Sequence, residues 1–382
     1  MKEVGKIKDA CIVIAGQSPK GSSYNENGEG LEFHQGKKAF GVSIIEHSNV
    51  WTTEITKIAE PGDILMSVRA PVGPTNITDR KICIGRGLAA IRCNRDIIPQ
   101  YILYALRNIE SKIIGNDGAV FNSINRKQIE DLPLPILSLS EQQSIVDYLD
   151  SAFAKIDAMK ANAEKALNEA KALFQASLKE MLEPKEGWEE KTLREVCSLI
   201  TDGTHHSPPN NENGKYKYIT AKNIKIWGLD LSNITYVSED IHKEIIARCY
   251  PQKGDVLYIK DGATTGIAIV NPLEEEFSIL SSVALIKPNK EVLSSEFLCY
   301  TLNSPSIYNQ TRNQMDGAAI TRVTLVKIKG FVVPIPPISE QQRIVLHLDS
   351  LKSKVDRLQE NYEKISQECD ALKQAILRQV FE

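Results

Sequence analysis

This chain repeats one stretch almost unchanged: Ser140-Glu141-Gln142-Gln143-Ser144-Ile145-Val146 returns as Ser339-Glu340-Gln341-Gln342-Arg343-Ile344-Val345. When residues 140–183 are laid on residues 339–382, 21 of the 44 positions are identical. A repeat of this length is too long for the short period of a solenoid protein. The motif therefore indicates that a large part of the chain has been duplicated.

Landmarks upstream of the motif also occur in pairs. They keep their order along the chain while the offset between the copies only grows, as small insertions in the second copy would produce. The pairs are Asn25–Gly28 with Asn211–Gly214, Gly62–Leu65 with Gly254–Leu257, and Tyr101–Leu106 with Phe297–Leu302. The sequence therefore predicts globular parts at residues 1–139 and 184–338, each followed by one long helix at residues 140–183 and 339–382.

Each copy of the motif opens a predicted helix. A proline-rich stretch precedes it, Leu132–Pro135 in the first copy and Pro334–Pro337 in the second, and proline favours extended backbone just before a helix. Ser140 and Gln143, like their second-copy counterparts, have the spacing of an S-x-x-Q capping box. Apolar residues then follow at alternating spacings of four and three, which is the heptad pattern of a coiled coil.

The heptad positions form a predicted contact seam. They include Ile145, Leu149, Ile156, Met159 and Leu173 in the first helix, and Ile344, Leu348, Leu351, Val355, Leu358, Ile365 and Leu372 in the second. Alanines on the first seam would fit the larger side chains on the second, so we expect the helices to pair, most simply antiparallel. The alternative is that each helix belongs only to the core of its own domain. Further apolar residues predict a second face for a helical partner: Val146, Phe153, Leu167, Phe174, Leu178, Val345 and Val380.

The globular parts combine strand and helix patterns. Strands are predicted at Asp63–Arg69, Leu88–Arg92, Asp255–Lys260 and Val283–Lys287, and helices at Ile98–Arg107 and Ser295–Leu302. Short alternating or apolar runs bounded by turn residues are typical of strands. The predicted fold class is α+β: a tandem duplicate of a mixed globular domain plus a long helix, with the two helices paired as an antiparallel coiled coil.

Composition limits the possible classes of protein. The formal net charge is −3, and no apolar run is long enough to span a membrane. The start of the sequence lacks the apolar core of a signal peptide, and the seven cysteines include no C-x-x-C pair. We therefore expect a cytoplasmic protein with reduced thiols and without a disulfide scaffold or a zinc ribbon.

No motif indicates catalysis. The sequence lacks a G-x-S-x-G elbow, an H-E-x-x-H helix and the tetrapeptide of an amino-methyltransferase. Gly16–Ser22 has the glycine spacing of a phosphate-binding loop but not its lysine, so a turn is predicted there. His205 and His206 are adjacent, which points their side chains apart, and no nearby Cys or His completes a metal site. We expect no catalytic residue, metal or cofactor in this chain.

Charge separates the helices from the globular parts. The two helices together carry a net charge of −4, and the two globular parts together carry +1. Positive and aromatic residues gather near glycines and polar turns in both copies, where Lys, Arg and neutral polar groups would suit phosphates and base edges. For any one of them, an exposed solubilising charge is the alternative. The candidates are Lys20, Tyr24, Lys37, Lys38, Arg69, Arg86, His205, His206, Lys215, Lys217, Lys222, Lys225 and Lys260.

Four features together resemble the specificity subunit of type I restriction–modification systems. The first is the proline-rich lead into Ser-Glu-Gln-Gln-x-Ile-Val, present twice. The second is the Gly-Asp-Ile/Val-Leu strand with Arg69 or Lys260 soon after it. The others are the Asp202–His205 loop, whose first-copy counterpart is Ala15–Ser18, and the Gly187-Trp188 opening of the second copy, which the first copy lacks. The resemblance covers nearly the whole chain.

The resemblance implies a DNA reader that is not itself an enzyme. Each globular part would be a target recognition domain for half of a split, asymmetric DNA sequence, and the helices would be the spacer that sets the distance between the halves. Two modification subunits, which bind S-adenosylmethionine and methylate adenine, and two restriction subunits would assemble on it. Two alternatives stay open: a self-sufficient DNA methyltransferase or nuclease, and a coiled-coil adaptor that does not bind nucleic acid.

Overall fold

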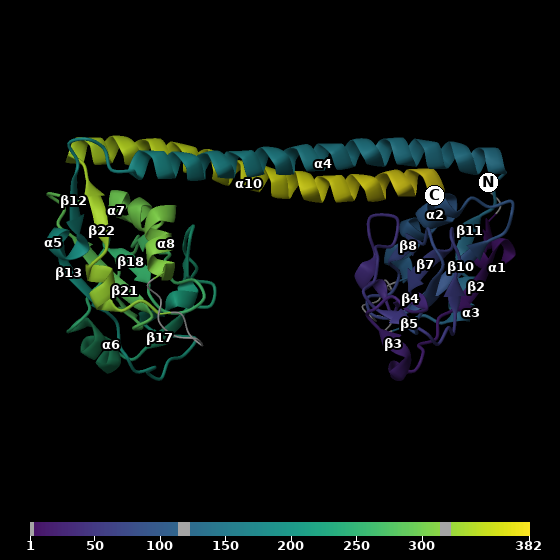
Figure 1. Ribbon diagram of the computed structural model, residues 1–382, viewed down its shortest axis with the longest axis horizontal. Helices are drawn as coiled ribbons and strands as arrows, with labels where there is room; N and C mark the ends of the chain where they lie inside the picture. The colour runs from purple at the N-terminus through teal and green to yellow at the C-terminus, as the bar shows by residue number, and fades with distance from the viewer. Residues whose placement is uncertain (1–3, 114–122, 314–321) are drawn as a thin grey trace. The chain divides into compact units, whose positions relative to one another are not determined.

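The computed structural model describes residues 4–113, 123–313 and 322–382. The chain divides into two compact units: unit 1 comprises residues 1–163 and 362–382, and unit 2 comprises residues 164–361. Each unit combines a mixed α/β globular part with one half of each long helix (Figure 1). The predicted fold class, a tandem α+β duplicate with two paired helices, is confirmed.

Unit 1 contains two main sheets. An antiparallel sheet has the order β2-β10-β7-β8, and a second sheet has the order β3-β5-β4-β9-β6, in which β4 and β9 are parallel. The elements are β1 (Val4–Lys6), α1 (Ile7–Ala10), β2 (Cys11–Ala15), β3 (Tyr24–Asn25), β4 (Leu31–His34), β5 (Trp51–Thr52), β6 (Ile58–Ala59), β7 (Ile64–Ser67), β8 (Thr75–Ile77), β9 (Ile82–Ile84), β10 (Leu88–Cys93), α2 (Pro99–Ile113), α3 (Arg126–Glu130) and β11 (Pro133–Pro135), with short 3-10 turns η1 (Gly21–Ser23) and η2 (Lys37–Ala39).

Unit 2 repeats this plan. Its antiparallel sheet has the order β13-β21-β18-β19, and the parallel pair β14 and β20 corresponds to β4 and β9. The elements are β12 (Glu189–Thr192), α5 (Leu193–Val196), β13 (Cys197–Asp202), β14 (Tyr216–Ile219), η3 (Ala221–Asn223), β15 (Ile224–Lys225), β16 (Gly228–Leu229), β17 (Thr235–Val237), α6 (Glu239–Ile246), β18 (Val256–Ile259), β19 (Ala268–Val270), β20 (Phe277–Ile279), β21 (Val283–Pro288), α7 (Ser295–Leu302), α8 (Pro305–Asn313), α9 (Leu325–Lys329) and β22 (Val332–Ile335).

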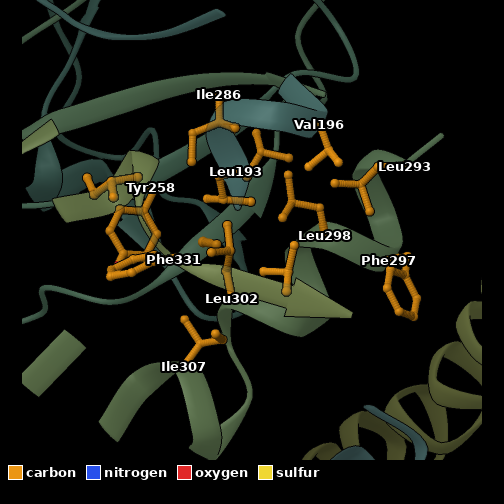
Figure 2. Close-up of a cluster of buried hydrophobic side chains, with 14 of the residues drawn as sticks. Leu193, Val196, Tyr258, Ile286, Leu293, Phe297, Leu298, Leu302, Ile307 and Phe331 are labelled. Carbon is orange, nitrogen blue, oxygen red and sulfur yellow. The ribbon is translucent and has the colours of Figure 1, made fainter. Parts of the chain in front are cut away.

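A buried apolar cluster joins the antiparallel sheet of unit 2 to its helices (Figure 2). Tyr258 on β18, Ile286 on β21, and Phe297 and Leu302 on α7 all belong to this cluster, and all four side chains are fully buried. Burial of large apolar side chains contributes about 1.5–3 kcal/mol each. The strand and helix positions that carry this core match the apolar runs of the sequence.

The proline-rich lead-ins form short strands. β11 pairs antiparallel with β1 in unit 1, and β22 pairs antiparallel with β12 in unit 2. The first strand of each unit therefore closes against the segment that leads into the long helix. The first copy has this pairing although it lacks the Gly-Trp opening of the second copy.

The long helices are α4 (Leu139–Leu182) and α10 (Ile338–Phe381), and they pair antiparallel within each unit. In unit 1 the first half of α4 contacts the last half of α10, where Cys369 packs on Ile156 and Lys373 pairs with Asp157 at 2.5 Å. In unit 2, Lys171 donates to Gln359 at 2.8 Å. Among the described residues, no helix combines the length and apolar character that crossing a membrane requires.

The predicted seam is correct on most of α10 and wrong on part of α4. Ile145, Leu149 and Ile156 are buried or half-buried, as are the α10 positions Ile344, Leu348, Leu351, Val355, Leu358 and Ile365. Three predicted seam residues instead face solvent: Met159 and Leu173 are each 59% exposed, and Leu372 is 47% exposed.

The register differs because two lysines occupy seam positions. After Ile156 the buried side of α4 steps by four residues to Lys160, whose ammonium lies 3.4 Å from Asp370. Lys373 replaces Leu372 on α10 in the same way. A lysine can bury its aliphatic stem while its charged head stays in water. A residue that counts as polar in the sequence can therefore take a position in an apolar helix contact.

This shift also corrects the predicted second face. The seven residues assigned to that face are all buried or half-buried: Val146, Phe153, Leu167, Phe174, Leu178, Val345 and Val380. They belong to the packed side of the helices. The apolar residues left in solvent on these helices are instead Met159, Leu173 and Leu372, together with Leu139, Tyr148 and Leu346.

The capping prediction is also wrong. The cap of α4 is Ser138, whose backbone N–H donates to Glu141 at 2.9 Å, and Ser140 lies inside the helix. In α10 the backbone N–H of Gln341 donates to the carbonyl of Pro337, so Ser339 is not the cap either. The first glutamine of each motif has a different role, because both Gln142 and Gln341 are completely buried.

Both buried glutamines bind backbone groups of the domain before the helix. The Gln142 side chain accepts from Ile98 N at 2.9 Å and donates to the carbonyls of Asp96 and Leu137 at 3.1 and 2.9 Å. Gln341 repeats the pattern: it accepts from the backbone N–H of Ser294 at 2.9 Å and donates to two carbonyls, both at 2.8 Å. The repeated motif therefore fixes each helix to its own globular part.

Candidate nucleic-acid interface

Unit 1 has a cleft of about 780 Å³ beside the parallel strand pair. Four parts of the chain surround it: the loop after β2, the end of β4 with η2, the segment at residues 46–50, and Arg86 between β9 and β10. Three sequence candidates, Tyr24, Lys38 and Arg86, line this cleft. Tyr24 stacks on Phe33 with ring centroids 4.9 Å apart, which holds an aromatic face at the cleft. Cations, amides and an aromatic ring together suit a nucleic-acid ligand.

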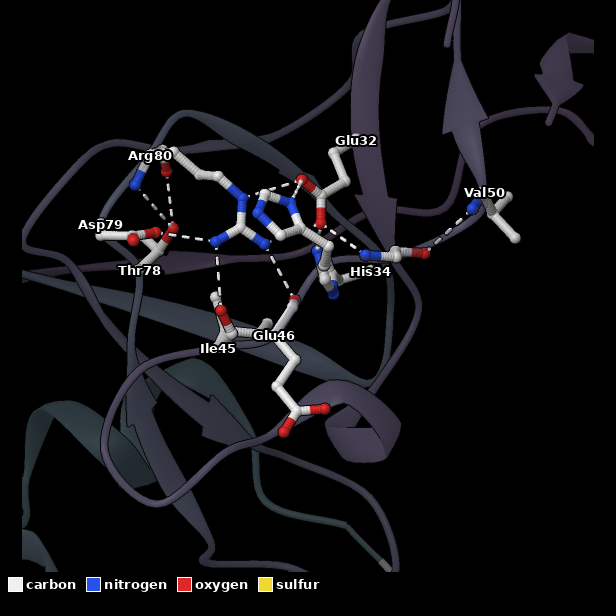
Figure 3. A network of polar contacts seen from close by, with 10 residues as sticks. Glu32, His34, Ile45, Glu46, Val50, Thr78, Asp79 and Arg80 are labelled. Atoms are coloured by element: carbon white, nitrogen blue, oxygen red, sulfur yellow. Dashed lines mark hydrogen bonds and ion pairs between the residues drawn. The ribbon is translucent and has the colours of Figure 1, made fainter. Parts of the chain in front are cut away.

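A buried carboxylate supports one wall of this cleft (Figure 3). Glu32 is 3% exposed and accepts two hydrogen bonds from Arg80, each 2.8 Å long. Glu32 also accepts from the backbone N–H of Ser48 at 2.6 Å and contacts the rings of His34 and His47. The loop at residues 45–50 is thereby tied to β4, and sequence reasoning does not single out any residue of this network.

The network changes the ionisation of its members. Burial by itself would raise the pKa of Glu32, but hydrogen bonds from Arg80, Ser48 and the two histidines lower it to about 2. Burial lowers the pKa of His34, although the neighbouring Glu32 opposes that shift. Glu32 is therefore a carboxylate at neutral pH, and the folded unit favours this charged form.

We predict that acid destabilises unit 1 through Glu32. Its pKa is depressed from 4.5 to about 2 in the folded state, so the unfolded chain binds the proton first as pH falls. The stabilisation is complete above about pH 5 and is lost progressively towards pH 2. Urea unfolding between these pH values, followed by hydrogen exchange in unit 1 peptides, should show this loss. The Glu32→Gln variant should have a weaker dependence of unfolding free energy on pH. An unchanged slope in that variant would contradict the assignment.

Unit 2 has a cleft of about 1000 Å³ next to the corresponding strand pair. The sequence candidates Lys222 and Lys225 line it, together with Asn210, Asn223 and Asp261. Lys222 is exposed and follows β14 on η3, much as Lys37 and Lys38 follow β4 on η2. Each unit therefore places cations at the same edge of its parallel strand pair.

The other candidates lie outside these two linings. In unit 1, Lys20, Lys37 and Arg69 are exposed. In unit 2, Lys215 lies over the ring of Tyr216 and Lys217 pairs with Glu275 at 2.5 Å. His205 and His206 are exposed, and His205 lies 3.2 Å from Asp202. The structure thus brings five of the thirteen candidates to the clefts. Apart from Lys260, the others stay predicted contacts to nucleic acid outside the two clefts.

Lys260 differs from the prediction because it is buried. Its side chain is 2% exposed, and its ammonium lies 2.9 Å from Asp261 and 3.5 Å from Asp202. Arg248 also binds Asp202, at 2.5 Å, and Arg322 lies 3.1 Å from Asp261. A phosphate cannot reach an ammonium that is enclosed in this way. Lys260 instead joins β13 and β18 beneath the cleft.

Lys260 and Arg69 also do not occupy equivalent positions. In β18 and β21, Ile259 pairs with Val283, and the matching pair in unit 1 is Ser67 with Leu88. Lys260 therefore corresponds to Val68, and Arg69 corresponds to Asp261. A slip of one residue moves a side chain to the opposite face of a strand, which explains why Arg69 is exposed and Lys260 is buried.

Sequence reasoning from charge does not identify the amide side chains at the clefts. These are Gln35 and Asn49 in unit 1, and Asn210, Asn223 and Asn233 in unit 2. The glycines that flank Arg86 are the one local signal, because glycine allows backbone segments to approach closely. Amide side chains are too common in loops for their sequence positions to identify a binding site.

Close backbone contact fixes the loop that follows the first strand of each antiparallel sheet. A Cβ atom on Gly16 would lie 2.2 Å from the carbonyl oxygen of Gly85, and one on Gly203 would lie 1.8 Å from that of Ile279. The residues that follow these glycines, Gln17 and Thr204, donate equivalent backbone hydrogen bonds to β9 and β20. The loops Ala15–Ser18 and Asp202–His205 are therefore structural counterparts.

We predict that Gly16→Ala and Gly203→Ala each destabilise their own unit by about 1–3 kcal/mol, because the backbone must move to admit the methyl group. Urea unfolding resolved by hydrogen exchange for each unit is the measurement. Gly21→Ala is the control, since no heavy atom lies within 4 Å of a Cβ at that position. Equal stability of Gly16→Ala and Gly21→Ala would contradict the contact.

The side chains that line the two clefts can be compared with the groups that known ligands require. Within residues 4–113, 123–313 and 322–382, no group of three or more His, Cys, Asp or Glu side chains could hold a metal ion. Both linings include cations, amides and hydroxyls. Such groups bind phosphate oxygens and the edges of bases.

Relatives carry the same architecture. A chain of a type I R-M system, solved to explain complex assembly and conformational transition, has a TM-score of 0.78 at 20% identity and covers 100% of this chain and 97% of its own. The HsdS subunit from Thermoanaerobacter tengcongensis has a TM-score of 0.58 at 20% identity, with coverage of 99% and 96%. These likenesses establish a shared fold.

Sequence comparison gives relatives of the same kind. The MjaX specificity subunit of a type I restriction enzyme in Methanocaldococcus jannaschii is 44% identical over 36% of this chain and 32% of its own length. The EcoBI specificity subunit of Escherichia coli is 23% identical over 84% of this chain and 73% of its own. The family model described as "Type I restriction modification DNA specificity domain" matches residues 2–169 and 185–367. With both copies matched over most of their length, the chain belongs to the family of type I restriction–modification specificity subunits.

Proposed function

We propose that this chain is the DNA-reading subunit of a type I restriction–modification complex and has no catalytic activity of its own. The observation that carries the proposal is the repetition of a cleft lined with cations and amides in two units of a chain whose family is shown. Each unit would read one half of a split sequence. Because the linings differ, the two halves would differ, and the target would be asymmetric.

The helices would supply the spacer and the docking surface. α4 and α10 contribute to both units, so their length would set the separation of the two half-sites. Met159, Leu173 and Leu372 remain exposed on the helices. These apolar side chains would become buried if a partner subunit docks on the helices. Two modification subunits, which bring S-adenosylmethionine, and two restriction subunits would complete the assembly.

Binding and activity assays with and without the partner test this proposal. The purified chain should bind duplex DNA with an affinity that falls as salt rises, since phosphate contacts release counterions. With S-adenosylmethionine or magnesium alone it should neither methylate nor cut DNA, and adding the modification subunit should start adenine methylation. Methylation or cleavage by the chain alone would favour the alternative, a self-sufficient enzyme with an unrecognised site. No binding at low salt would favour an adaptor that does not contact nucleic acid.

We predict that the spacer length sets the gap in the target. Inserting one heptad into both α4 and α10 should keep the pairing and lengthen each helix by about 10 Å, or about three base pairs of DNA. One heptad inserted near Ala163 in α4 alone should damage folding. The measurement is the gap between half-sites in the methylated motif. An unchanged gap in the doubly lengthened chain would exclude the spacer role.

A further inference from the structure

Three loops meet at one point in unit 1, beside the cleft. Ser18 follows β2, Gln35 follows β4 and Arg86 follows β9. The Ser18 hydroxyl donates to the Gln35 side-chain oxygen at 2.9 Å and accepts from the backbone N–H of Arg86 at 3.2 Å. All three residues line the cleft. We call these three residues the three-loop junction.

Glycine makes this junction tight. A Cβ on Gly87 would lie 2.4 Å from the carbonyl oxygen of Gln35, and one on Gly85 would lie 2.6 Å from its side-chain oxygen. The backbone N–H of Gly87 donates to the Gln35 carbonyl at 3.0 Å. The segments that carry Gln35 and Arg86 are therefore held in contact by backbone, and the positions of the two side chains are set by the fold.

Unit 2 repeats two of the backbone hydrogen bonds around this junction. Gly85 N donates to His34 O in unit 1, and Leu280 N donates to Ile219 O in unit 2. In the same way, Val68 N donates to Gly87 O, and Lys260 N donates to Ser282 O. These pairs align Gln35 with Thr220 and Arg86 with Ser281, and the equivalent backbone hydrogen bonds of Gln17 and Thr204 align Ser18 with His205.

The side chains at these equivalent positions differ in every case. Unit 1 has a hydroxyl, an amide and a guanidinium at these positions, whereas unit 2 has an imidazole and two hydroxyls, of which the Thr220 hydroxyl caps η3. A framework that is kept while its outward groups change is what two readers of different sequences require.

The unit 1 groups have the chemistry of base readers. Arginine binds the major-groove edge of guanine and glutamine that of adenine, each through two hydrogen bonds. Gln35 and Arg86 are exposed, and among the described residues no protein group occupies the Gln35 amide nitrogen or the terminal nitrogens of Arg86. Ser18 orients both residues and leaves these donors for a ligand.

We propose that Gln35 and Arg86 are specificity-determining residues that contact base edges in the half-site read by unit 1, and that Thr220 and Ser281 hold the corresponding positions in unit 2. This inference rests on the proposed function and deepens it. Arg86 reads guanine and Gln35 reads adenine in the half-site of unit 1. The other exposed lysines bind phosphates and carry no sequence information.

Selection from duplexes with a random central region tests the inference with the full-length chain. Arg86→Ser and Gln35→Thr replace each residue by the one that unit 2 carries on the same backbone framework. Each should lower discrimination about 5- to 150-fold at one or two base pairs of one half-site and leave the other half-site unchanged. Thr220→Gln with Ser281→Arg should instead alter the other half-site. Arg95→Ser is the matched control, because exposed Arg95 follows the far end of β10 and should keep the motif.

Three outcomes are distinguishable. If the wild-type chain selects a split motif and both unit 1 variants select that same motif, the inference is wrong and the proposed function stands. If Arg86→Ser weakens binding equally for all sequences, Arg86 binds phosphate and the inference is again wrong. If the wild-type chain selects no sequence at all, the proposed function itself fails.

Discussion

Replacing Lys260 by valine is expected to destabilise unit 2 by about 3–5 kcal/mol, because it leaves a buried carboxylate and a half-buried one without their shared partner. Asp202 is 2% exposed and Asp261 is half-buried, and both lie within 3.5 Å of the Lys260 ammonium. Arg248 and Arg322 would still pair with these carboxylates from the surface, but they do not fill the space between them. Urea unfolding, followed by hydrogen exchange in unit 2 peptides, measures the loss.

The chain supplies its own control for this prediction. The positions of Asp202 and Lys260 are occupied in unit 1 by Ala15 and Val68, which share the same strand register. Asp202→Ala combined with Lys260→Val should therefore recover much of the stability, since a buried ion pair can be replaced by apolar groups at little cost. A double variant as unstable as the sum of the single variants would contradict this role for Lys260.

Replacing Gln142 or Gln341 by alanine is expected to cost about 3 kcal/mol in the unit concerned. Each side chain makes three hydrogen bonds to backbone groups, and removing it leaves buried donors and acceptors without partners. The helix would then lose its attachment to the globular part. Hydrogen exchange at the start of α2 for Gln142→Ala, and at the start of α7 for Gln341→Ala, should rise first.

The neighbouring glutamines are matched controls. Gln143 and Gln342 are exposed, and Gln143 donates only to Asp147 within α4. Gln143→Ala and Gln342→Ala should change stability by less than about 0.5 kcal/mol. Equal effects at both glutamines of one motif would mean that the motif acts through the helix itself and not through its attachment.

The repeat and the helices could be predicted because their signals are local. The repeated sequence motif identifies the two copies, and proline-rich stretches followed by heptads of apolar residues identify the two long helices. The predicted helix caps and seam residues are wrong where neighbouring residues fit the same sequence pattern equally well. Ser138 and Glu141 have a capping spacing as good as that of Ser140 and Gln143. The seam was misplaced because Met159 looks apolar in the sequence, whereas the stem of Lys160 packs in its place.

The site was harder to predict because loops distant in the sequence build it. The glycines that flank Arg86 make it a candidate in the sequence. Ser18 and Gln35, the other two residues of the three-loop junction, lie far before it in the sequence and carry no charge. Lys260 was misassigned because one residue of strand register decides between burial and exposure. Local patterns do not report that register to within one residue.

The most direct test of the central claim is a map of methylated adenines in cells that express this chain with its modification subunit. Two reading units on one pair of helices predict a single split motif, with two different half-sites separated by a fixed number of unread base pairs. A continuous motif, or two identical half-sites, would contradict the account, and so would methylation that does not depend on this chain.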